Sequence, residues 1–92
     1  MKILLSNWES AYKIVILKRA RKYIEAQNAN VQKQLLCAMQ QLPNGDTKQL
    51  KGKENLFRLC VGNVRVIYSI DNNIITITVI DIGNRGQIYN RY

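Results

Sequence analysis

The residues in the second half of this chain that are best suited to chemistry are its arginines, lysines and tyrosines. Histidine is absent from the chain, so the commonest general base and the commonest metal ligand are both missing. Arginine binds phosphate oxygens through paired hydrogen bonds and keeps its charge, while tyrosine can stack on an unpaired base or exchange a proton. These residue types favour phosphate chemistry, with no cofactor and no metal.

Two of the arginines fall on one face of a predicted β-hairpin. Residues 56–61 and 64–70 are rich in β-branched and aromatic side chains, and Gly62-Asn63 between them suits a tight turn. Because side chains alternate along a strand, Arg58 and Arg65 fall on one face. The opposite face carries the apolar set Phe57, Leu59, Val61, Val66, Tyr68 and Ile70. If the apolar face meets helices, the two arginines lie on the open face of neighbouring strands.

Other basic and phenolic groups are expected to join the same surface. Arg85 follows the last predicted strand and Tyr89 comes four residues later, while Lys51 and Lys53 lie in the loop that leads into 56–61. Several basic positions that converge beside an aromatic residue favour a nucleic-acid site. The alternative is a solvated charged face without a ligand, which would account for any single arginine.

Length and composition restrict the possible partners. A chain of 92 residues forms one domain, with an irregular lead-in over 1–11 and a core over 12–92. The 14 Lys and Arg outnumber the 6 Asp and Glu, and the net charge of +8 favours nucleic acid, an acidic protein or an anionic membrane. No apolar run approaches the ~20 residues that span a bilayer, and no signal peptide is expected. Cys37 and Cys60 form no disulfide or metal pattern, which fits a reducing, cytoplasmic setting.

Hydrophobic periodicity predicts the elements that position these residues. Tyr12–Leu17 has the composition of a strand and Lys18–Gln27 the pattern of a helix. A second helix is predicted to begin with Asn30 as its N-cap and to stop at Pro43. Consecutive hairpins over 56–82 then form an antiparallel meander. Because only the helical hairpin is available to cover one face of that sheet, the order β-α-α-β-β-β predicts an α+β fold with one twisted antiparallel sheet.

Four motifs follow one another through the second half of the chain. They are Leu50-Lys51-Gly52, Leu56-Phe57-Arg58-Leu59, Val61-Gly62-Asn63-Val64-Arg65-Val66-Ile67-Tyr68, and Ile80-Asp81-Ile82-Gly83-Asn84-Arg85 followed by Ile88-Tyr89. The series resembles the RelE/ParE superfamily of type II toxins, whose chains often read L-K-G, then y-R-l-R-v-G-x-y-R-v-i-Y, then I-G-x-R-x-x-x-Y. The resemblance covers roughly residues 12–92, has its specific part in 48–89, and implies a RelE-like fold.

The resemblance also implies an activity and a set of site residues. It implies a ribosome-dependent endoribonuclease that cuts messenger RNA in the ribosomal A site, by attack of a ribose 2′-oxygen on the adjacent phosphate. The residues expected to hold the phosphate, orient the base or assist proton transfer are Arg58, Arg65, Arg85 and Tyr89. Further RNA contacts are expected from Lys51, Lys53, Phe57 and Arg91.

Two positions depart from the family pattern. Cys60 stands where the second basic residue of the R-l-R element is expected, and Asn84 stands where many relatives carry a histidine. The lost positive charge weakens charge stabilisation near the scissile phosphate unless Lys51 or Lys53 reaches it. The general base is left open between a lysine beside the arginines and a group of the ribosome or the substrate.

Two other functions share this scaffold. One is a non-catalytic toxin of the ParE branch that inhibits DNA gyrase, which Cys60 and the lack of histidine favour. The other is a module without activity whose only ligand is its antitoxin. In every case a cognate acidic antitoxin is the expected partner, in a toxin–antitoxin hetero-oligomer, and the nuclease adds the ribosome and messenger RNA. No membrane partner is expected, because the basic helix Lys18–Gln27 is short and weakly apolar.

Overall fold

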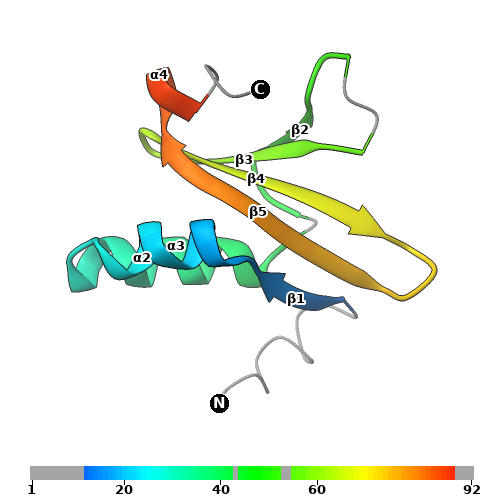
Figure 1. Ribbon diagram of the computed structural model, residues 1–92, viewed down its shortest axis with the longest axis horizontal. Helices are drawn as coiled ribbons and strands as arrows, with labels where there is room; N and C mark the ends of the chain where they lie inside the picture. Colours follow the sequence, from blue (N-terminus) through cyan, green and yellow to red (C-terminus); the bar gives the residue numbers. More distant parts are fainter. Residues whose placement is uncertain (1–11, 43, 53–54, 89–92) are drawn as a thin grey trace.

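The computed structural model describes residues 12–42, 44–52 and 55–88. A five-stranded sheet, in the order β1-β5-β4-β3-β2, carries a helical hairpin on one face and a short helix at one end (Figure 1). The elements along the chain are β1 (Lys13–Ile16), α2 (Lys18–Glu25), α3 (Ala29–Gln40), β2 (Thr47–Gln49), β3 (Phe57–Val61), β4 (Val64–Asp71), β5 (Thr76–Asn84) and α4 (Arg85–Ile88). The predicted α+β fold is confirmed.

The sheet differs from the prediction in two ways. It is mixed, because β1 pairs with β5 in parallel, whereas a fully antiparallel sheet was predicted. It also gains the strand β2, which pairs antiparallel with β3 but consists of the polar residues Thr47, Lys48 and Gln49. Apolar alternation reveals a strand that is buried on one side. It does not reveal the neighbour of a strand, nor an edge strand that is made of polar residues.

The two helices differ slightly from their predicted bounds. The prediction of Asn30 as the N-cap of α3 is wrong, since Asn28 takes that position and its side chain accepts a hydrogen bond from the backbone N–H of Val31. Both asparagines have the chemistry of a cap, and the fold selects the earlier one. The first helix, predicted to reach Gln27, ends at Glu25.

The main core lies between the helical hairpin and one face of the sheet. Phe57 and Tyr68 are paired across β3 and β4, and their rings stack with centroids 5.6 Å apart. The predicted alternation is therefore confirmed, because the apolar sets of both strands meet the helices. The buried residues of this core are Ala20, Ile24, Leu35, Met39, Leu42, Leu59, Val66, Tyr68, Ile77, Val79 and Ile82.

The second face of the sheet is partly covered by α4. This short helix packs against β4 and β5 on the side away from α2 and α3 (Figure 1). Ile88 of α4 and Ile67 of β4 are both fully buried, although neither belongs to the main core. Hence this face, predicted to be open, is open only where α4 does not reach.

None of the helices in the described residues is long and apolar enough to cross a membrane. The predicted lead-in, residues 1–11, lies outside the described residues.

Candidate functional site

Arg58 and Arg65 lie on the face of β3 and β4 that points away from the helical hairpin. Cys60 is directly opposite Arg65 in the β3–β4 register, and paired residues share a face of the sheet. Arg58, two residues before Cys60 on the same strand, points to the same side and donates a hydrogen bond from Nη1 to the Cys60 Sγ. The thiol thus stands between two guanidinium groups.

The Arg65 side chain bends over the turn that joins the two strands. Its Nη1 donates to the carbonyl oxygens of Gly62, at 2.8 Å, and of Val64, at 3.1 Å. Gly62 has a φ of +60°, a conformation that glycine adopts without strain. The Nε–H of Arg65 is buried and has no acceptor among the described residues. A buried, unpaired donor costs about 1–3 kcal/mol.

Arg85 is tied to the same turn. It begins α4, and its backbone N–H donates to the Asn63 carbonyl oxygen at 2.8 Å, while its side chain is exposed. The Arg65 side chain and the Arg85 backbone are therefore both tied to one hairpin turn. Arg58 lies on the same face of the sheet as Arg65, four residues before Gly62. We call this surface the arginine face and define it by Arg58, Cys60, Arg65 and Arg85.

The structure adds one cation to this side of the sheet and places another at the Arg58 end of β3, away from the Gly62-Asn63 turn. Lys48 of β2 is paired with Arg58, so it shares the arginine face, and it is exposed. Sequence reasoning missed it because β2 carries no apolar signal. Lys51 is exposed in the loop before β3, at the end of that strand opposite to the Gly62-Asn63 turn. With five residues in β3, the two ends are roughly 13 Å apart.

The remaining predicted site residues are not brought to the arginine face. Phe57 packs on Tyr68 against the main core, on the covered side of the sheet, so the structure places it away from the predicted RNA contacts. Lys53, Tyr89 and Arg91 lie outside the described residues. Among the residues that are described, no group of His, Cys, Asp or Glu is arranged to hold a metal ion.

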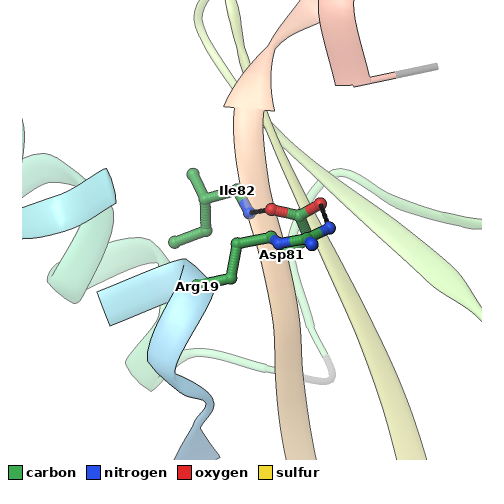
Figure 2. Close-up of polar contacts among 3 residues, drawn as sticks. All are labelled: Arg19, Asp81 and Ile82. Carbon is green, nitrogen blue, oxygen red and sulfur yellow. Dashed lines mark hydrogen bonds and ion pairs between the residues drawn. The ribbon is translucent and has the colours of Figure 1, made fainter. Parts of the chain in front are cut away.

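A buried carboxylate lies near the arginines and was not singled out by the sequence. Asp81 of β5 is fully buried, and its Oδ1 accepts from the backbone N–H of Ile82 at 2.9 Å. Its Oδ2 lies 3.6 Å from the Arg19 Nη1, so a side chain of α2 reaches β5 (Figure 2). Pairing and hydrogen bonding are what make a buried carboxylate tolerable.

A second polar contact joins the same two elements. The hydroxyl of Tyr23 on α2 donates to the Asn84 Oδ1 at 2.9 Å. Burial raises the pKa of Tyr23 above its usual value, which keeps the hydroxyl protonated as a donor. Asn84 directly precedes Arg85, so α2 helps to fix the point where the chain leaves β5.

Comparison with known proteins gives a family and a set of similar folds. The family described as ParE toxin of type II toxin-antitoxin system, parDE, matches residues 16–89. A search of curated protein sequences finds no match.

Three solved structures illustrate the similarity of fold. The archaeal RelE–RelB complex from Pyrococcus horikoshii OT3 is 24% identical over 83% of this chain and 97% of that one, with a TM-score of 0.68. The RelB–RelE antitoxin–toxin complex from Methanococcus jannaschii is 20% identical over 85% and 98%, with a TM-score of 0.69. The isolated E. coli RelE toxin is 18% identical over 87% and 93%, with a TM-score of 0.62.

Proposed function

This chain belongs to the ParE toxin family of type II toxin–antitoxin systems, and we propose that it is a toxin that cleaves messenger RNA on the ribosome. The observation that carries the proposal is the arginine face, where Arg58 and Arg65 share one side of the sheet and the backbone of Arg85 is tied to the β3–β4 turn. Guanidinium groups in a fixed arrangement suit an oxygen-rich anion whose charge grows during the reaction.

The proposed reaction needs no external co-reactant. The 2′-oxygen of a ribose attacks the adjacent phosphorus, and the bond from phosphorus to the 5′-oxygen of the next nucleotide breaks. The products are a 2′,3′-cyclic phosphate and a 5′-hydroxyl. The 2′-hydroxyl loses its proton during the attack, and the leaving 5′-oxygen gains one. The arginines stabilise the negative charge that builds up on the phosphoryl oxygens.

The arginines have separate parts in this proposal. The Arg65 Nη1 is held by the turn, so the guanidinium group is oriented before RNA arrives. Arg85 is exposed and reaches the phosphate from α4. Arg58 donates a hydrogen bond to Cys60, and we assign it to RNA binding rather than to contact with the scissile phosphate. Tyr89, four residues after Arg85, is proposed to stack on the base or to transfer a proton.

An acidic antitoxin is the proposed protein partner. The net charge of +8 favours a partner of opposite sign, and two structures of similar fold are complexes of RelE with the antitoxin RelB. We propose a cytoplasmic toxin–antitoxin hetero-oligomer in which the antitoxin neutralises the basic chain. Mixing the chain with the product of an adjacent acidic reading frame, and measuring the mass of the complex, tests this partner.

The nuclease is tested by inducing the chain in cells and mapping message ends by primer extension. Wild-type protein should produce new ends within coding regions, and Arg65→Gln and Arg85→Gln should remove them. Lys33→Gln is the matched control, because Lys33 is an exposed cation on α3, in the layer behind the sheet. Message ends that persist in both arginine variants would refute the proposed roles.

A second candidate function is inhibition of DNA gyrase without RNA cleavage. The match to a family described as ParE favours it, as do the absence of histidine and the thiol at Cys60. The same induced cells distinguish the two functions. Gyrase-dependent DNA breaks with intact messages would select the inhibitor, whereas cut messages with intact DNA would select the nuclease.

A further inference from the structure

The helix α2 lies along the part of β5 where the edge opposite to β4 has no strand beside it among the described residues. The parallel pairing of β1 with β5 ends where Ile16 meets Val79, and α2 begins at Lys18 and packs against β5. Arg19 and Tyr23, one helical turn apart on α2, contact Asp81 and Asn84 of β5. Side chains at i and i+4 lie on the same side of a helix, so one polar side of α2 is aligned with this edge of the sheet.

The contact with Asp81 brings Arg19 to the arginine face. Asp81 is paired with Ile67 of β4, and Ile67 is paired with Arg58 of β3. Residues paired across strands share a face, so Asp81 lies on the same side of the sheet as Arg58. The Arg19 guanidinium, which starts from the helical layer, passes the edge of β5 to reach it (Figure 2).

Asp81 holds only part of this guanidinium. The carboxylate is fully buried, whereas the Arg19 side chain is 66% exposed. Arginine carries five N–H donors in a planar fork, and the ion pair at 3.6 Å is made by one of its nitrogens. The buried carboxylate therefore orients a cation whose side chain remains mostly exposed.

The pairing of β4 with β5 gives the position of Arg19 relative to the other arginines. Asp81 and Gly83 point to the same face of β5 and are about 7 Å apart, from two residues at roughly 3.3 Å each. Gly83 is paired with Arg65, and Arg85 follows two residues later. The position on β5 that Arg19 contacts is thus about 7 Å from the position paired with Arg65.

From this geometry we infer that Arg19 is a fourth phosphate-binding cation of the arginine face and that Asp81 is its positioning residue. Arg19 binds an RNA phosphate that neighbours the one held by Arg65 and Arg85. This inference rests on the proposed RNA-cleaving function. It adds a contact from the helical layer, so the RNA strand crosses the end of β5 as well as the β3–β4 turn.

The first test measures how salt weakens binding of a single-stranded RNA oligonucleotide to the purified chain. Each lost phosphate contact reduces the slope of log affinity against log salt by about 0.7 for a single strand. Arg19→Gln should show this reduction. Arg21→Gln is the matched control, because Arg21 is an exposed cation on the same helix and its loss changes net charge equally. Equal slopes in the two variants would overturn the inference.

A second variant separates phosphate binding from simple neutralisation of Asp81. Arg19→Gln leaves a buried carboxylate without its cation, and that alone can destabilise the fold. The double variant Arg19→Gln/Asp81→Asn removes both charges and avoids that cost. If Arg19 binds phosphate, the double variant keeps the reduced slope. If Arg19 only neutralises Asp81, the double variant recovers the wild-type slope, and the inference is wrong.

Arg65→Gln in the same assay separates this inference from the proposed function. A reduced slope for Arg65→Gln with an unchanged slope for Arg19→Gln would remove Arg19 alone from the site. Unchanged slopes in both variants, or no binding of RNA by the wild-type chain, would overturn the inference about Arg19. The proposed cleavage of messages on the ribosome is tested separately, by the mapping of message ends in induced cells.

Discussion

The two faces of the sheet are built from the same strands but are stabilised in different ways. Toward the helices, β3 and β4 present Leu59, Val66 and Tyr68, which are buried among apolar neighbours. On the other face the same strands present Arg58 and Arg65, whose guanidinium groups are held by a thiol and by turn carbonyls. Because strand side chains alternate, each face can be altered without touching the other. Stability and activity should therefore be separable by mutation.

The largest expected effect comes from the covered face. Leu35 of α3 is fully buried, and Leu35→Ala should lower the free energy of unfolding by about 2–5 kcal/mol through lost burial and a cavity. Its neighbour Leu36 is 43% exposed, and Leu36→Ala should stay within about 0.5 kcal/mol of wild type. Urea denaturation measures both. Equal losses in the two variants would contradict the position assigned to the core.

The second-largest effect is expected from adding a cation to the arginine face. Cys60→Arg adds a cation directly opposite Arg65, and a hydrogen bond to a charged phosphate contributes roughly 1.5–3 kcal/mol. RNA affinity should rise by about tenfold or more. Cys37→Arg makes the same chemical change at an exposed cysteine on α3 and should leave affinity nearly unchanged. Equal gains in RNA affinity for the two variants would contradict the assignment of RNA binding to the arginine face.

A smaller effect is expected from a change at Phe57, which separates stability from RNA binding at a single residue. Phe57 stacks on Tyr68 on the covered face, and such ring pairs contribute about 0.5–1.5 kcal/mol. Phe57→Leu should lower the free energy of unfolding by about that amount while leaving RNA affinity at the wild-type value. Urea denaturation and a binding titration check the two parts. A loss of affinity in the folded variant would return Phe57 to the RNA-binding set.

The smallest effect is a dependence of stability on pH. Burial raises the pKa of Tyr68 above 10.0, and a hydrogen bond with Thr47 opposes the shift without cancelling it. Since the unfolded tyrosine then loses its proton first, the free energy of unfolding should fall as pH rises above 10.0. Tyr68→Phe should fall less than wild type when unfolding is compared at about pH 8 and about pH 11. Equal declines would show that Tyr68 does not contribute.

Most of the fold that was predicted from the sequence rested on the alternation of side chains along the strands. In β3 and β4 a period of two separates the residues of the main core from Arg58 and Arg65, so the face of the two arginines followed without any contact being known. The cap of α3 shows where local chemistry stops being decisive. Asn28 and Asn30 are equally good N-caps by type, and only the packed helical hairpin distinguishes them.

The residues that were missed depend on partners that local patterns do not contain. Lys48 lies in an edge strand with no apolar residue, so only its pairing with Arg58 places it. Arg19 has the sequence context of an ordinary solvated helix, and only the end of β1 opposite Val79 lets it reach Asp81. Ile88 is buried because α4 packs on the second face, a long-range contact without a sequence signature.

The most direct test supplies purified ribosomes, programmed with a defined message, with wild-type chain or with Arg65→Gln. Wild-type protein should cut the message and leave a 2′,3′-cyclic phosphate and a 5′-hydroxyl. Arg65→Gln should cut about 100-fold more slowly, because one donor to the developing charge is lost, while its urea unfolding matches wild type. Equal cutting rates, or no cutting by the wild-type chain, would contradict the assignment of RNA cleavage to the arginine face.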